Sequence, residues 1–306
     1  MTEEIAKYGG LSMAELKERQ TSIGASDAGA ALGLSKYKTP YQLWEEKTAS
    51  EIVWFDNPIL KRGRMFEPVL RQMYSDETGR PVKKVPKMTS EKYPFMSASP
   101  DGYAEDGKRY IEIKTARNKR EWGEPGSDEI PLPYMIQVQH GLVVTGLEVA
   151  DIPVSFSMDD FAIYEVPADK ELQEMIIEKE AAFWELVKNR IPPEPSNYVD
   201  VYRRFAQSMP KSIQAESDIV GAIQSLKSIK LSQKDMKERE DQLKTMIGKF
   251  MSDADTLIDF DGKPLCTWRT SKPTVLFDLD RFKKEQPNLF KNYTKESKPA
   301  RRFLLK

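Results

Sequence analysis

The Asp106-Gly107 dipeptide constrains the fold of this chain more than any other feature of its sequence. Asp-Gly is a strong signal for a tight β-hairpin turn, because both residues readily adopt the positive φ angles that such a turn requires. The segments 93–99 and 108–115 on either side of it have the composition of strands, and so does 81–85. We therefore expect a three-stranded meander whose last two strands are joined at this turn.

Helix signals precede and follow the predicted meander. Ser26 and Asp27 are typical N-cap residues, and Pro68 is tolerable only in the early turn of a helix. The patterns predict helices from Ser26-Asp27 to Gly33, Thr39-Pro40 to Lys47, 64–78, Pro133 to Val144 and 169–189, and strands at 149–156 and 161–166. This order predicts an α/β protein in the broad sense, an α+β arrangement with a mixed sheet flanked by helices.

The proline cluster at 191–195 predicts a domain boundary near 195–205. We expect an enzymatic domain over 1–200 and a C-terminal module over 201–306. In the module, the apolar spacing predicts a long amphipathic helix pair over 208–251. A β-hairpin turning at Asp261-Gly262 and a short helix at 278–286 are expected to follow.

The scarcity of histidine and cysteine excludes whole classes of chemistry. The chain has one of each, His140 and Cys266, so a Cys/His zinc site and a cysteine-ligated iron–sulfur cluster are not available. A single cysteine also fits a reducing cytoplasm, and no secretory leader or apolar run of about 18 residues is evident. Acidic residues remain for catalysis, which favours chemistry with a hard metal ion.

Charge is distributed unevenly along the chain. Residues 201–306 contain 22 Lys and Arg against 14 Asp and Glu, whereas 1–200 contain 25 against 34. An acidic domain followed by a basic C-terminal segment is typical of a metal enzyme whose basic segment contacts phosphate groups. A basic tail that contacts only solvent is the equal alternative. The module is therefore a candidate for contacts with DNA, with a partner protein or between subunits.

Two carboxylates and one ammonium are expected to converge at the hairpin. Strand alternation places Glu112 and Lys114 on one face, and the hairpin folds Asp101 back beside Glu112. Asp101, Glu112 and the backbone carbonyl of Ile113 can supply hard oxygen ligands to a divalent cation. Lys114 can polarise an attacking water, which suits hydrolysis of a phosphodiester. The alternative is a surface hairpin with an ordinary cross-strand Glu–Lys pair.

Five short segments carry a resemblance that favours the catalytic interpretation. They are Ile-Gly-Ala-Ser-Asp at 23–27, Gly-Arg-Met-Phe-Glu at 63–67, Ser-Pro-Asp-Gly at 99–102, Glu-Ile-Lys at 112–114 and Tyr-Met-Ile-Gln-Val-Gln at 134–139. Over about residues 15–190, the chain resembles the phage lambda exonuclease and YqaJ-type viral recombinase family of PD-(D/E)XK nucleases. Five linked motifs in one order are far more specific than any one of them alone.

This resemblance implies a restriction-endonuclease-like core and a 5′→3′ exonuclease of phage-type homologous recombination. Such an enzyme resects linear double-stranded DNA to leave 3′ single strands, uses Mg²⁺, for which Mn²⁺ can substitute, forms a homotrimer and works beside a single-strand annealing protein. The matched catalytic positions are Glu67, Asp101, Glu112, Lys114 and Gln137, with Glu67 as a further candidate metal ligand, and Arg19 and Ser26 match positions that hold the 5′ phosphate.

Each transferred role has a structural alternative. Glu67 and Arg19 can be solvated helix residues, Gln137 a helix-surface amide, and Ser26 a plain N-cap. His140 lies one helical turn from Gln137, at a position where lambda exonuclease has tyrosine, so no role transfers and a structural or DNA-adjacent place is expected.

Two other functions remain open at this point. One is a PD-(D/E)XK endonuclease or resolvase, which would cut DNA that has no ends. The other is a non-catalytic DNA-end-binding recombination scaffold, which the complete set of acidic positions disfavours.

Overall fold

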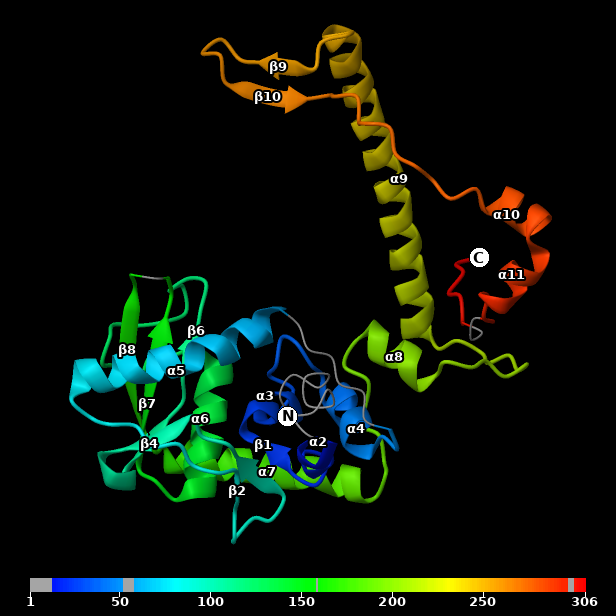
Figure 1. Cartoon of the computed structure of the whole chain (residues 1–306). Coiled ribbons are helices and arrows are strands. Elements are labelled where there is room, and N and C mark those ends of the chain that lie inside the picture. The colour runs from blue at the N-terminus through cyan, green and yellow to red at the C-terminus, as the bar shows by residue number, and fades with distance from the viewer. Residues whose placement is uncertain (1–12, 52–57, 158, 297–299) are drawn as a thin grey trace. The chain divides into compact units, whose positions relative to one another are not determined.

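The computed structural model describes residues 13–51, 58–157, 159–296 and 300–306 (Figure 1). The chain divides into two compact units, Met1–Arg204 and Phe205–Lys306. Within the described residues, no helix has the length and apolar character needed to cross a membrane.

The first unit contains most of the regular structure. Its helices are α2 (Met13–Glu18), α3 (Ala25–Ala31), α4 (Pro40–Thr48), α5 (Pro58–Thr78), α6 (Leu132–Thr145), α7 (Lys170–Lys188) and α8 (Tyr198–Arg204), with a short 3₁₀ turn at Glu105–Gly107. Its strands are β1 (Ile23–Gly24), β2 (Met88–Thr89), β3 (Met96–Ala98), β4 (Gly102–Ala104), β5 (Arg109–Ile111), β6 (Lys114–Thr115), β7 (Val149–Ser155) and β8 (Phe161–Pro167).

The larger sheet is mixed and is organised around β7. Strands β5 and β6 are successive pieces of one run, and both pair with β7 in parallel. β8 pairs with β7 in antiparallel orientation, and β4 pairs with β5 in the same way. A smaller sheet has the order β1-β3-β2, with β1 parallel and β2 antiparallel to β3. This arrangement confirms the predicted mixed α/β class.

Helices cover both faces of the larger sheet (Figure 1). Alternate residues of β7, namely Ala150, Ile152 and Val154, are buried in the cluster that includes Val138 and Leu142 of α6. On the opposite face, the buried cluster joins Tyr74 of α5 to Ala104 and Ile111. Because strand side chains alternate between faces, each strand residue near the active region can be assigned to one helix or the other. The face covered by α6 carries the candidate site.

The predicted meander is wrong in its first two strands. The turn at 105–107 joins β4 to β5, whereas 93–99 contributes β3 to the other sheet. The segment 81–85 forms a single bridge, between Lys83 and Tyr103. Pro100 separates β3 from β4, so one apparent strand region is divided between two sheets.

Two helix starts also differ from expectation. α3 begins at Ala25, with Gly24 as its N-cap and no capping side chain, so Ser26 lies inside the first turn and is not the cap. α5 begins at Pro58, which places Pro68 in the helix interior. The start of α4 is as predicted, because Thr39 and Gln42 form a capping box there.

The second unit has one long helix where a pair was expected. α9 (Ser217–Met251) runs without interruption, and residues 208–216 are not helical. The predicted hairpin is present as β9 (Thr256–Ile258) and β10 (Pro264–Thr267), with Gly262 at φ 79° in its turn. The expected short helix is α10 (Leu279–Glu285), and α11 (Pro287–Asn292) follows it.

Candidate active site

The candidate site forms where β5 gives way to β6. β5 ends at Ile111 and β6 begins at Lys114, and the amide of Glu112 donates to the carbonyl of Asp151 (3.1 Å), which keeps the run attached to β7. Tyr110, Glu112 and Lys114 alternate along this run and therefore direct their side chains to the α6 face.

Asp101 is held beside this run by two hydrogen bonds. Its backbone amide donates to the carbonyl of Ile111 (3.0 Å), and the amide of Ile113 donates to Oδ2 of Asp101 (2.6 Å). The second oxygen, Oδ1, accepts no hydrogen bond from the described part of the chain. The structure thus brings Asp101 next to Glu112, as the hairpin predicted.

Glu112 is the centre of a hydrogen-bond network on that face. Its Oε1 accepts from Nζ of Lys114 (2.7 Å) and from Nε2 of Gln137 on α6 (2.6 Å). Its Oε2 accepts from the hydroxyl of Tyr110 (2.9 Å). Lys114 also donates to Oε1 of Gln137 (3.0 Å). Four side chains are therefore fixed relative to one another, and three of them were predicted as site residues.

Tyr110 is the member of this network that the sequence analysis missed. Its side chain is fully buried, and burial together with the neighbouring Glu112 raises the pKa of its hydroxyl well above 10. The signal was present in the sequence, because strand alternation places residue 110 on the same face as 112 and 114.

Burial and charge shape the ionisation of the site. Burial, reinforced by the charge of Glu112, raises the pKa of Asp101 to about 7. Burial alone would lower the pKa of Lys114, but the carboxylates of Glu112 and Asp101 outweigh it and raise that pKa. One ammonium does not fully compensate two buried carboxylates, so the site has the electrostatic character of a cation site.

The donor set also fits a hard divalent cation. A carboxylate has about four acceptor positions, so Glu112, which accepts three hydrogen bonds, keeps one position, and Asp101 keeps an oxygen. Across the described segments, no group of three or more His, Cys, Asp and Glu side chains is placed to hold a metal ion. The protein ligands would therefore be two carboxylates completed by backbone carbonyl and water oxygens.

Glu67 is connected to this centre through one intervening side chain, that of Arg71. It forms an ion pair with Arg71, one turn later on α5, and Arg71 donates from Nε to the backbone carbonyl of Asp101 (3.1 Å). Lys84 also approaches Glu67, at 3.7 Å. Glu67 therefore contacts the segment of Asp101 through Arg71. Arg71 was not singled out from the sequence, although the i,i+4 spacing of Glu and Arg is a recognisable pairing signal.

A cavity of about 250 Å³ joins the catalytic candidates to the predicted phosphate residues. Glu112 and Gln137 line it together with Arg19 and Ser26, so four separately predicted residues share one space. Its walls also include residues that the sequence analysis did not select as site residues, namely Gly24, Ala25, Asp27, Lys47, Lys87, Ser97 and Ser99.

A buried ion pair supports one wall of this cavity. Nζ of Lys47 contacts Oδ2 of Asp27 (2.8 Å) and donates to the carbonyl of Arg19 (2.6 Å). Burial would raise the pKa of Asp27, but Lys47 and Lys38 outweigh it and hold that pKa well below its usual range. The pair ties the end of α2 to the start of α3 and so fixes the backbone of Arg19.

His140 is a structural residue beneath the site. It is fully buried, its Nδ1 lies 2.8 Å from Oε1 of Glu180, and its Nε2 lies 3.0 Å from the carbonyl of Ser97. These contacts link α6, α7 and β3 and leave His140 no access to a substrate. Of its two expected places, the structural one is correct.

The family description "YqaJ-like viral recombinase domain" matches residues 16–148. The uncharacterized protein YqaJ of Bacillus subtilis (strain 168) is 30% identical over 326 residues, covering 99% of this chain and 97% of that protein. The chain belongs to the YqaJ-like viral recombinase family. Among the predicted site residues, Glu67 and Gln137 lie on α5 and α6, Lys114 lies on β6, and Asp101, Glu112 and Ile113 lie in the segments directly next to β4, β5 and β6. All predicted site residues lie within the matched residues.

Two of the solved structures similar to this YqaJ-like chain are described as exonucleases. The alkaline exonuclease LHK-Exo of Laribacter hongkongensis has a TM-score of 0.49 and 22% identity, covering 58% of this chain and 94% of its own. A phage-related exonuclease of Haemophilus somnus 129PT has a TM-score of 0.43 and 15% identity, covering 56% and 95%.

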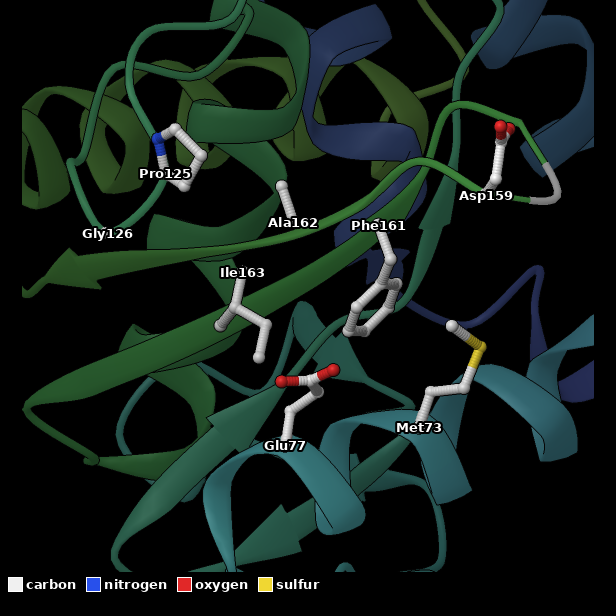
Figure 2. A pocket seen from close by; sticks show the side chains of 8 residues that line it. All are labelled: Met73, Glu77, Pro125, Gly126, Asp159, Phe161, Ala162 and Ile163. Carbon is white, nitrogen blue, oxygen red and sulfur yellow. The ribbon is translucent and has the colours of Figure 1, made fainter.

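A second cavity, of about 550 Å³, lies on the other side of the sheet of the YqaJ-like domain. Figure 2 shows Met73 and Glu77 of α5 facing Phe161 and Ile163 of β8 across it. None of the predicted site residues lines this cavity. The α6 face therefore remains the candidate active face.

Proposed function

We propose that the chain is a divalent-metal-dependent nuclease that degrades one strand of linear double-stranded DNA in the 5′→3′ direction. Mg²⁺ is the proposed cation, and Mn²⁺ would substitute for it. The observation that carries the proposal is the convergence of Asp101, Glu112, Lys114 and Gln137. Glu112 and Gln137 of this group line the cavity that Arg19 also lines. Membership of the YqaJ-like viral recombinase family supports a role in phage-type recombination.

The proposed chemistry divides the work among these side chains. A bound divalent cation would offset the charge of the scissile phosphate and lower the pKa of a water. Asp101, Glu112 and the carbonyl of Ile113 would hold that cation. Lys114 polarises the attacking water and stabilises charge that develops on the phosphate oxygens. Gln137, fixed by Glu112 and Lys114, orients the water through its amide.

Residues outside this centre would position substrate and ligands. Arg19 and Ser26 are proposed to hold the 5′ phosphate, because they line the same cavity as Glu112. Glu67 is proposed to act through Arg71 on the segment of Asp101. A homotrimer and a single-strand annealing partner are further proposals that rest on resemblance. A role of residues 201–306 in contacts with DNA, with a partner protein or between subunits is a further proposal that rests on their excess of basic residues.

The decisive experiment is digestion of a 5′-phosphorylated linear duplex that is end-labelled on each strand in turn, with Mg²⁺ and with EDTA. We expect Mg²⁺-dependent loss of the strand that presents its 5′ end, leaving a 3′ single strand. Relaxation or linearisation of supercoiled circles would indicate an endonuclease or resolvase instead. Binding to duplex ends without any cleavage would indicate a recombination scaffold.

A further inference from the structure

The cations that line the 250 Å³ cavity differ in how firmly they are committed to protein partners. Lys47 is almost fully buried, with 4% of its side chain exposed, and its ammonium already contacts Asp27 and the carbonyl of Arg19. If it turned towards a ligand, the buried carboxylate of Asp27 would lose its 2.8 Å partner and, within the described chain, keep only Lys38, at 3.4 Å, which is costly. Lys47 therefore has a supporting role in the cavity wall.

Lys87 is in a different situation. Its side chain is 22% exposed, and its ammonium pairs with Oε1 of Glu18 (3.0 Å), whose own side chain is 53% exposed. Glu18 does not line the cavity, whereas Lys87 does. An ion pair of this exposure contributes little to stability, so a second anion can replace Glu18 at small cost.

The backbone position of Lys87 is fixed relative to the catalytic segment. Lys87 directly precedes β2, and β2 pairs with β3, whose Ser97 is another cavity residue. β3 leads through Ser99, which also lines the cavity, to Asp101. A group bound by Lys87 would therefore lie at a set place relative to the carboxylates.

We propose that Lys87 binds the 5′-terminal phosphate of the DNA strand whose scissile bond lies at Asp101 and Glu112, and that Glu18 holds the Lys87 ammonium until that phosphate displaces it. The inference rests on the proposed nuclease function. A 5′-phosphorylated strand carries a phosphate on each side of its terminal nucleotide, so a cavity that reaches Glu112 must also accommodate the neighbouring phosphate. Charge-assisted hydrogen bonds to phosphate are among the stronger contacts available to lysine.

The test compares duplexes that differ only in a 5′ phosphate or a 5′ hydroxyl. Binding is measured by fluorescence anisotropy with Ca²⁺ in place of Mg²⁺, and initial rates are measured with Mg²⁺. Lys87→Gln should weaken binding of the phosphorylated duplex about tenfold and leave binding of the hydroxyl duplex unchanged. For the phosphorylated duplex, the slope of log affinity against log salt should also fall by about one unit.

Lys92→Gln is the matched control. Lys92 is exposed in the turn between β2 and β3, and it does not line the cavity. The same charge is removed from the same small sheet, so a general electrostatic effect would appear in both variants. The proposal requires that Lys92→Gln bind both duplexes as the wild-type protein does.

Glu18→Gln should change the affinity for the phosphorylated duplex in the opposite direction. Release of Lys87 from its carboxylate should strengthen binding of the phosphorylated duplex by about threefold, and this gain should vanish in the Lys87→Gln background. A gain that persists in the double variant would overturn the role assigned to the ion pair. Equal weakening of both duplexes by Lys87→Gln would overturn phosphate recognition.

Failure of this inference is distinguishable from failure of the nuclease proposal. If the wild-type protein digests linear duplex but Lys87→Gln retains its preference for the phosphorylated end, only the role of Lys87 is refuted. If the wild-type protein cleaves no DNA, the nuclease proposal fails, and the inference that rests on it fails as well.

Discussion

Substitution of Gly141 by alanine should disturb the candidate site indirectly, by displacing the side chain of Tyr110. A Cβ at this position of α6 would lie 2.6 Å from Cζ and 2.7 Å from the hydroxyl oxygen of Tyr110. Real Cβ atoms essentially never approach other atoms so closely, and Tyr110 is fully buried, so its ring has no free space to enter. Because the Tyr110 hydroxyl donates to Oε2 of Glu112, movement of the ring would move that carboxylate.

The expected magnitude combines two opposing terms. Overpacking of a dense interior typically costs about 1–3 kcal/mol. Replacement of a helical glycine by alanine stabilises the folded state by roughly 0.5–1 kcal/mol, because a chain with alanine at this position loses less backbone entropy on folding than a chain with glycine. Gly141→Ala should therefore lower the free energy of unfolding by about 1–2 kcal/mol. Displacement of Glu112 by a fraction of an ångström should also slow digestion by about 10- to 100-fold.

Gly63→Ala is the control for helix propensity. Gly63 lies in α5, and a Cβ there would meet nothing within 4 Å, so this variant should be slightly more stable than wild type. Both variants are compared by urea unfolding followed by tryptophan fluorescence, to which the first unit contributes four of the five tryptophans. Equal stability of the two variants, with unchanged digestion by Gly141→Ala, would refute the proposed link through Tyr110.

Four further variants test three separate parts of the structure. Glu112→Gln and Lys114→Ala should each abolish digestion while DNA binding in a gel-shift assay stays within a few-fold of wild type; normal digestion would exclude the proposed chemistry. Asp27→Asn should cost about 3–5 kcal/mol at neutral pH, because Lys47 loses its buried partner. Because the folded state lowers the pKa of Asp27, the stabilisation by this ion pair is present above the unfolded pKa of about 3.8 and is lost as the pH falls below that value. The stability difference between wild type and Asp27→Asn, measured by urea unfolding, should therefore shrink below pH 3.8. A difference that does not depend on pH would contradict the ion pair. Gly102→Ala should lower the thermal midpoint by several degrees, since its Cβ would lie 2.8 Å from the carbonyl oxygen of Lys83; an unchanged midpoint would mean that the 82–83 segment moves aside freely.

The central part of the site was predictable because it is local in sequence. A short hairpin brings Asp101 beside Glu112, and strand alternation places Glu112 and Lys114 on one face. Neither feature depends on the rest of the fold. Gln137 comes from a distant helix, and only the family resemblance brought it to the same place. The structure places it within hydrogen-bonding distance of Glu112 and Lys114, and its catalytic role remains a prediction.

Other parts of the cavity depend on long-range packing and carry little signal. Lys87 reaches the site because β2 pairs with β3, and two-residue strands of this kind have no recognisable periodicity. Asp27 and Lys47, which are 20 residues apart in the sequence, form an ion pair that joins α3 to α4. A lysine on a helix looks solvated from its sequence, whereas this one is buried by the packing of α3 and α4.

The fold-level errors have similar causes. Pro68 suggested an early helix turn, yet α5 continues on both sides of it, because burial of Leu70 and Tyr74 outweighs the roughly 3 kcal/mol that an interior proline costs. In the second unit, hydrophobic periodicity cannot distinguish a helix pair from one long helix. The only glycines between 217 and 251 are Gly221 and Gly248, and no proline is present, so nothing there favours a turn.

Titration of the protein with Mn²⁺ tests directly whether Asp101 and Glu112 share a divalent cation. Binding is monitored as the loss of the electron paramagnetic resonance signal of free Mn²⁺. The wild-type protein should bind Mn²⁺, and Asp101→Asn and Glu112→Gln should each remove that binding. The control variant Asp159→Asn, which changes a carboxylate in the cavity on the opposite face, should bind as wild type does. Unchanged Mn²⁺ binding by both Asp101→Asn and Glu112→Gln would contradict the metal site.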